Sequence, residues 1–85
     1  MSKSVFTSAY ASLLATLIAL RKAAGVTQSG LAARLGKPQS FVAKVEQGAR
    51  RVDVIEFYEL CRALGADPEA VFAELVRELP ERVEI

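Results

Sequence analysis

One stretch, residues 27–48, restricts the fold of this chain more than any other. Its sequence, TQSGLAARLGKPQSFVAKVEQG, has the start and stop signals of two short helices joined by a tight turn. Thr27 is a favourable N-cap for the first helix, and Gly36 is the kind of residue expected just after its end. Pro38 suits the first position of the second helix, and Gly48 ends that helix. The stretch therefore predicts two helices that do not merge into one.

The second helix of this pair has two unlike sides. Val42 and Val45 are expected to face the core. The opposite side combines polar residues with one aromatic ring: Gln39, Ser40, Phe41 and Lys44. Because residues 40 and 44 are one helical turn apart, these side chains share a surface. That surface is suited to contact another molecule, and ordinary solvated polar residues are the alternative.

Apolar residues at three- and four-residue steps predict three further helices. They span residues 4–24 with Ser4 as cap, 54–64 with Asp53 as cap, and 68–79 after Asp67 and Pro68. The buried stripe predicted for 54–64 consists of Val54, Phe57, Cys61 and Leu64, widened by Ile55, Tyr58 and Leu60. Helix 68–79 carries more apolar surface than one buried side needs, and residues 81–85 read as a short strand or a frayed tail.

These elements predict one all-α domain of five helices over residues 1–85. We expect its core within residues 17–66, and we expect residues 67–85 to supply a dimerisation helix and a tail.

The composition argues against an enzyme or a metal-binding protein. With 52% hydrophobic and 25% charged residues, the 85-residue chain is globular in composition. It contains no histidine, which is the commonest general base and metal ligand. Its single cysteine, Cys61, provides no internal disulfide and is interpreted as an inert core residue. We therefore expect no enzymatic activity, no cofactor and no metal.

The most apolar run extends from Ala9 to Leu20. It is shorter than the roughly 20 residues that a membrane span needs. Its positive charges, Arg21 and Lys22, follow the run, whereas a signal peptide carries them in front. We expect a cytoplasmic protein without membrane contact.

Charge is divided between the two parts of the chain. Residues 1–52 carry eight Lys or Arg and one Glu, a net charge of +7, whereas residues 53–85 carry three Arg and nine Asp or Glu, a net charge of −6. Such a division predicts one surface that faces a polyanion and another turned away from it. Uneven solvated charge is the alternative.

Residues 20–65, LRKAAGVTQSGLAARLGKPQSFVAKVEQGARRVDVIEFYELCRALG, carry a family resemblance. The matching positions are Thr27-Gln28, Leu31-Ala32, Leu35-Gly36, Gln39-Ser40, Val45-Glu46 and Gly48. In this pattern the chain resembles the Xre family of helix-turn-helix regulators, the Cro and lambda-repressor-like DNA-binding domains. The resemblance implies binding to double-stranded DNA, with the second helix of the pair reading the major groove.

The resemblance also implies roles for individual residues. Base contacts are implied for Gln39, Ser40, Phe41 and Lys44, with glutamine suited to adenine and phenylalanine to the thymine methyl group. Phosphate contacts are implied for Thr27, Gln28, Lys37, Arg50 and Arg51. Arg21 and Glu46 occupy positions that form a buried ion pair in similar proteins, which would lock the first helix to the recognition helix.

Two positions depart from the family pattern and leave the target sequence open. Pro38 removes a backbone N–H donor, and Ala43 removes a side chain that is often polar. For Phe41, packing under a neighbouring loop is the alternative to a base contact. For Arg50 and Arg51, the alternative is a solvated loop.

The combined prediction is a transcriptional regulator, acting as a repressor, that binds a pseudo-palindromic operator as a homodimer and is nucleoid-associated when bound. The predicted dimer interface is the apolar surplus of the fifth helix: Val71, Phe72, Leu75, Val76 and Leu79. The alternative is an antitoxin-like or protein-interaction module whose C-terminal half binds another protein.

Overall fold

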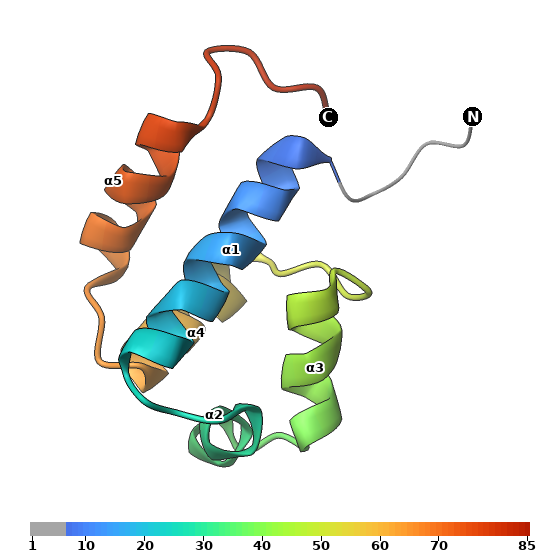
Figure 1. Cartoon of the computed structure of the whole chain (residues 1–85), viewed down its shortest axis with the longest axis vertical. Helices are drawn as coiled ribbons and strands as arrows, with labels where there is room; N and C mark the ends of the chain where they lie inside the picture. The colour runs from blue at the N-terminus through green and yellow to red at the C-terminus, as the bar shows by residue number, and fades with distance from the viewer. Residues whose placement is uncertain (1–6) are drawn as a thin grey trace.

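Helix α1, Ser8–Ala23, runs through the middle of the molecule, and the other helices surround it (Figure 1). The computed structural model describes residues 7–85. Within that range the remaining elements are α2 (Gln28–Leu35), α3 (Gln39–Gln47), α4 (Val54–Ala63) and α5 (Pro68–Glu78), without any strand. In Figure 1, α4 lies behind α1, α5 lies on the left and α3 on the right. The predicted all-α arrangement of five helices is confirmed.

The central core forms where the first four helices meet. Its buried side chains are Leu17 from α1, Leu31 and Ala32 from α2, Val42 and Val45 from α3, and Leu60 from α4. Val42 and Val45 are only 1% and 2% exposed, as their spacing on α3 predicted. Because these valines are packed against three other helices, the position of α3 is fixed by the core and not by the preceding turn alone.

Helix boundaries differ slightly from those expected. The N-cap of α1 is Thr7, whose Oγ1 accepts a hydrogen bond from the Tyr10 N–H at 3.1 Å, while the predicted cap Ser4 lies outside the described residues. Pro38 is the N-cap of α3 and not its first residue, because its ψ of 157° is extended. Helices α4 and α5 end at Ala63 and Glu78, one residue before their predicted ends.

The predicted apolar stripe of α4 is only partly buried. Leu60 and Cys61 are inside, whereas Val54 is 80% exposed and Ile55 is 70% exposed. The prediction for Val54 was wrong because the first turn of α4 borders an open groove of about 340 Å³ instead of a packed helix.

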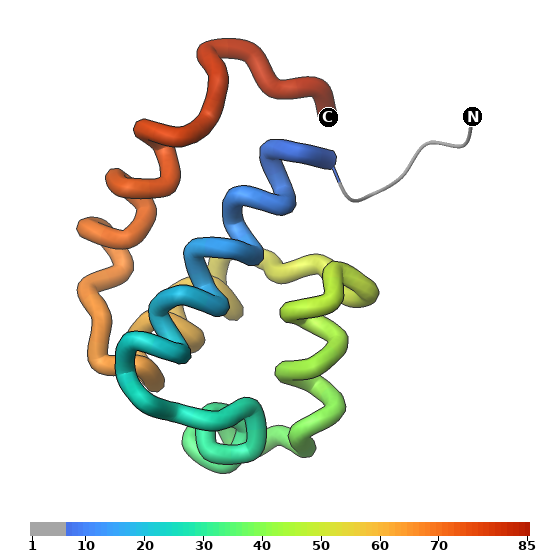
Figure 2. Tube along the Cα trace, viewed as in Figure 1, coloured from blue at the N-terminus to red at the C-terminus, as the bar shows by residue number. Residues whose placement is uncertain are grey.

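Residues 79–85 form neither helix nor strand, so a tail is observed in place of the alternative short strand. The chain turns back after α5 and crosses toward the N-terminal end of α1 (Figure 2).

Among residues 7–85, none of the helices alone has the length and apolar character to cross a membrane; α1 and α2 meet those criteria only as a pair, and they are bent by 96°.

Candidate nucleic-acid interface

Helix α3 projects one polar side away from the core. Gln39, Ser40 and Lys44 are exposed, whereas Val42 and Val45 are buried behind them. The turn before α3 begins at Gly36, whose φ of 68° lies in the left-handed region that glycine adopts without a steric penalty. The Lys37 N–H then donates to the Ala32 carbonyl at 2.9 Å, which closes the end of α2. The sequence pattern thus places the three predicted base-reading polar residues on one accessible surface.

An ion pair joins α1 to α3. Arg21 donates to both carboxylate oxygens of Glu46, with Nε–Oε2 and Nη2–Oε1 distances of 2.6 and 3.0 Å. The two side chains are 12% and 9% exposed, and Arg21 Nη1 also donates to the Val26 carbonyl at 2.9 Å. Burial raises the pKa of Glu46, but hydrogen bonds from Arg21 and Gln28 outweigh burial, and the pKa of this carboxyl is lowered. The pair implied by the family resemblance is therefore present and charged at neutral pH.

Two glutamines extend this ion pair to the polar side of α3. Gln28 Nε2 donates to Glu46 Oε1 at 2.9 Å, and Gln39 Nε2 donates to Gln28 Oε1 at 2.7 Å. Gln28 is half-buried, so it acts as a link between helices in addition to any contact with phosphate. The bond to Gln28 uses one N–H of the Gln39 amide, and the second N–H and the carbonyl oxygen are left for another ligand. The hydrogen bonds also fix which way the amide faces.

Phe41 lies beneath basic residues. Its ring is half-buried against the core, with Lys37 Nζ at 5.5 Å and the Arg50 guanidinium carbon at 4.8 Å from the ring centroid. Both distances are those of a cation–π contact. The ring therefore packs as a platform for two of the predicted phosphate-binding residues, in line with the alternative of packing under the next loop.

Arg50 is also held by an acid that the sequence reasoning missed. Its Nη1 and Nη2 donate to the two Glu56 carboxylate oxygens at 2.9 and 2.8 Å. Glu56 completes a capping box with Asp53 at the start of α4. Hydrogen bonds from Arg50, and then from the Asp53 N–H, lower the pKa of Glu56. The D-x-x-E spacing of residues 53–56 is the sequence signal that predicts such a box.

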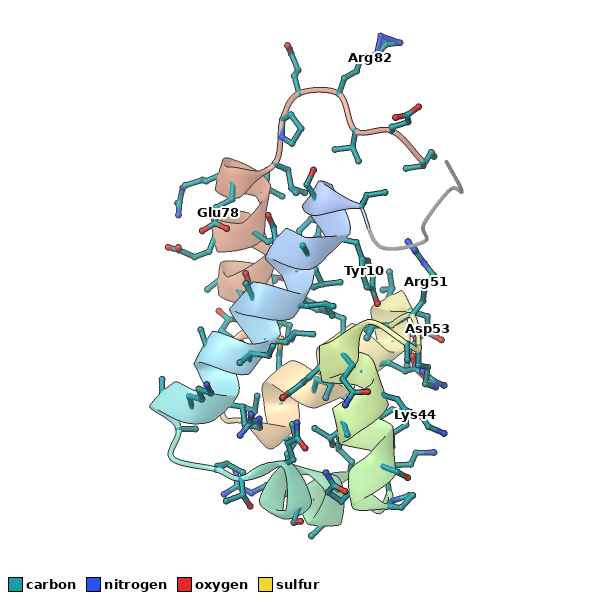
Figure 3. All side chains as sticks on the ribbon, turned by 45° about the vertical axis from the view of Figure 1, so that its right-hand side comes forward. Tyr10, Lys44, Arg51, Asp53, Glu78 and Arg82 are labelled. Atoms are coloured by element: carbon teal, nitrogen blue, oxygen red, sulfur yellow. The ribbon has the colours of Figure 1, made fainter. Side chains whose placement is uncertain are left out.

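Arg51 and the adjoining loop are attached to α1. The Arg51 guanidinium carbon lies 4.5 Å from the centre of the Tyr10 ring, and the Tyr10 hydroxyl accepts a hydrogen bond from the Val52 N–H at 3.0 Å. No sequence signal pointed to this role of Tyr10. Figure 3 shows Lys44, Arg51 and Asp53 on the same side of the molecule, with Glu78 and Arg82 well away from them. The basic loop thus stands beside α3.

The residues predicted for dimer contact do not share one environment. Val71 and Leu75 are 8% and 5% exposed and belong to the interior of the chain. Phe72 and Val76 are 54% and 48% exposed, and Leu79 is half-buried. Next to Phe72 lies the open groove of about 340 Å³, lined by Leu13, Val52, Asp53, Val54, Phe57, Phe72 and Leu75. Only part of the predicted set is therefore available to another molecule.

Comparison with known proteins shows similarity to helix-turn-helix proteins. Residues 12–75 match a family described as helix-turn-helix domain. A region of 46 residues, 54% of this chain, is 44% identical to an uncharacterized HTH-type transcriptional regulator, y4dJ, of Sinorhizobium fredii (strain NBRC 101917 / NGR234). The matched region spans 60% of the length of that relative.

Two solved structures resemble most of this chain in their arrangement of helices. An XRE-family like protein from Pseudomonas syringae pv. tomato str. DC3000 is 52% identical, with a TM-score of 0.81 over 86% of this chain and 89% of that one. The clp gene regulator ClgR from C. glutamicum is 27% identical, with a TM-score of 0.71 over 84% of this chain and 92% of that one.

Proposed function

This chain belongs to the XRE family of helix-turn-helix DNA-binding regulators, and from that premise we propose that it represses transcription as a homodimer bound to a pseudo-palindromic operator. We further propose that it does so in the cytoplasm, on the nucleoid. The observation that carries this proposal is the exposed side of α3, where Gln39, Ser40 and Lys44 stand opposite two buried valines.

Gln39 is the residue best prepared to read a base. Its bond to Gln28, at 2.7 Å, connects it through Glu46 to Arg21 and so to α1. A fixed amide loses less side-chain freedom on binding than a mobile one. Adenine offers one acceptor and one donor in the major groove, which match the remaining N–H and carbonyl oxygen of Gln39. We propose an adenine contact for Gln39, with Ser40 and Lys44 completing the base-reading surface.

We propose that the cationic side chains around α3 contact the phosphates of the DNA backbone. Lys37, Arg50 and Arg51 all lie over aromatic rings of the chain, at 5.5, 4.8 and 4.5 Å from the ring centroids. Thr27 and Gln28 at the start of α2 add polar groups at a helix N-terminus, which favours a phosphate. These contacts hold the protein on the duplex without reading its sequence.

The small base-reading surface of one copy supports the proposed homodimer. One copy of α3 offers few side chains to base edges, and two copies about 34 Å apart would meet one face of B-DNA one helical turn apart. Exposed Phe72, which lines the apolar groove, and exposed Val76 support self-association through α5.

Selection of bound duplexes from a randomised pool tests the proposal. We expect one enriched sequence with approximate twofold symmetry and half-sites separated by about 10 base pairs. If the Gln39→Ala variant enriched the same sequence with no base pair relaxed, base reading by Gln39 would be contradicted. No enrichment above the starting pool would contradict sequence-specific binding altogether.

The apolar surface of α4 and α5 also favours the second candidate function, a protein-interaction module that binds a different protein. Sedimentation of the purified chain separates the two. A dimer at micromolar concentration supports self-association, whereas a monomer, also with the selected duplex present, supports a heterologous partner.

A further inference from the structure

Arg50, which the proposed function places at the DNA backbone, is held by other residues of the chain, and this arrangement has no role in the proposed function. One side of its guanidinium group is covered by the Phe41 ring, at 4.8 Å, and its Nη1 and Nη2 atoms donate to Glu56. Nη1 also donates to the Arg51 carbonyl at 3.1 Å. The positive charge that would attract a phosphate is therefore matched by a carboxylate less than 3 Å away.

The structure assigns Glu56 a function in DNA recognition: it limits sequence-independent binding by neutralising Arg50 at the DNA-facing loop. This inference rests on the proposed function, because it requires that the loop after α3 faces the duplex. Glu56 would then be a residue of the DNA-facing surface that weakens DNA binding.

The negative charge of Glu56 is not needed for its other task. As the third helical residue of α4, it accepts the Asp53 N–H at 3.0 Å in the capping box, while Asp53 accepts the Glu56 N–H at 2.7 Å. Glutamine fills the same position in capping boxes, because its amide oxygen accepts the same bond. The charge can therefore be removed without removing the cap.

The Arg50–Glu56 pair also lies at a surface where the charge of each partner can act on a ligand. The side chains of Arg50 and Glu56 are 42% and 27% exposed, so the pair is open to solvent and to an approaching polyanion. Exposed ion pairs contribute little to stability, so the main consequence of the charge on Glu56 is its electrostatic effect on a ligand. Non-specific affinity for DNA depends on how many phosphates the protein neutralises. For each of these phosphates, the logarithm of the affinity falls by about 0.9 per unit increase in the logarithm of the salt concentration.

Binding to a random-sequence duplex of roughly 20 base pairs, measured by fluorescence anisotropy across a salt series, tests the inference. We expect Glu56→Gln to bind about five- to tenfold more tightly than the unchanged chain at about 0.1 M salt, with a slope steeper by about 0.9. The matched control is Glu74→Gln, which breaks an exposed ion pair with Arg77 on α5 and changes the net charge equally. The control should leave affinity and slope close to those of the unchanged chain.

A second variant shows whether the gain acts through Arg50. Arg50→Gln combined with Glu56→Gln removes both charges, and its affinity and slope should return to those of the unchanged chain. Circular dichroism of each variant verifies the fold. Equal binding by the Glu56→Gln and Glu74→Gln variants, or a double variant as tight as Glu56→Gln, would overturn the role of Glu56. Failure of the unchanged chain to bind any duplex at low salt would instead overturn the proposed function, and this inference with it.

Discussion

At the scale of single residues, Gln39 gives the sharpest prediction. Replacing it by alanine removes a bidentate base contact, and binding to the selected operator should weaken by about 1–3 kcal/mol, with relaxed preference at one base pair. Gln28→Ala should remove part of the same binding energy, because the Gln28 and Gln39 amides share a hydrogen bond. The variant with both substitutions should therefore lose less binding energy than the sum of the two single losses. Titration of labelled operator measures both effects. Gln47→Ala, at an exposed position near the end of α3, is the control, and an equal loss there would contradict the assignment.

Glu46 makes a prediction about pH. Its pKa is lowered in the folded chain, so its stabilisation is complete above the ordinary carboxyl pKa of about 4.3 and is lost as the pH falls through the folded-state value. We expect Glu46→Gln to reduce the free energy of unfolding by about 2–3 kcal/mol at pH 7, because Arg21 loses hydrogen bonds to a charged partner. The difference from the unchanged chain should shrink on acidification. Urea unfolding at several pH values measures it, and Glu59→Gln controls for the loss of one carboxylate. A difference independent of pH would contradict this account.

Individual residues also show where prediction from sequence ends. The Arg21–Glu46 contact followed from family positions, and the exposed polar side of α3 followed from helical spacing. The hydrogen bond from the Val52 N–H to the Tyr10 hydroxyl could not be predicted, because it joins residues 42 positions apart and depends on how α1 packs. Phe41 looked exposed because periodicity assigns a side of a helix but does not show what covers that side.

At the scale of elements, the turn between α2 and α3 depends on Gly36. Its φ is 68°, and an added Cβ would meet no atom within 4 Å, so the cost of a side chain there is confined to the backbone. We expect Gly36→Ala to lower the free energy of unfolding by about 1–2 kcal/mol and to leave the fold unchanged. Thermal and urea unfolding provide the measurement. The control is Ser29→Ala, at an exposed position of α2, which should change stability by less than about 0.5 kcal/mol. Equal stability of the Gly36 variant would indicate that the turn relaxes.

Other elements show which helix features a sequence can specify. Apolar spacing, together with caps and with glycine or proline stops, predicted the presence of every helix in the described range, because these signals are local. Gly30, inside α2, lies where a Cβ would be 3.2 Å from both Thr27 Oγ1 and Val26 Cγ1, a restriction that no local sequence signal predicts. The burial of α4 and α5 was predicted less well, because the apolar stripe of a helix does not reveal whether its neighbour is the same chain, solvent or another molecule.

At the scale of the whole molecule, α5 packs into the core and also carries the proposed dimer interface. Val71 and Leu75 complete the interior of the chain, so removing residues after Gly65 would expose α1 and α4 as well as remove the proposed interface. Truncation would therefore confuse loss of folding with loss of dimerisation. Charge substitutions on the exposed side of α5 separate the two effects, because exposed positions tolerate polar residues in a monomer.

Phe72→Glu is the variant that isolates the dimer. Phe72 is 54% exposed and packs edge-on against Phe57 with ring centroids 6.2 Å apart, so the isolated fold should lose about 1 kcal/mol or less. A twofold interface places the same surface on both copies, so the new carboxylates would enter it in pairs and oppose association. We expect sedimentation to show a folded monomer, with operator binding weakened much more than binding to a random duplex, because only the operator requires two correctly spaced copies. Ile55→Glu, at a 70% exposed position outside the groove, is the control for the oligomeric state. A Phe72→Glu chain that still sediments as a dimer would place the interface elsewhere than on α5.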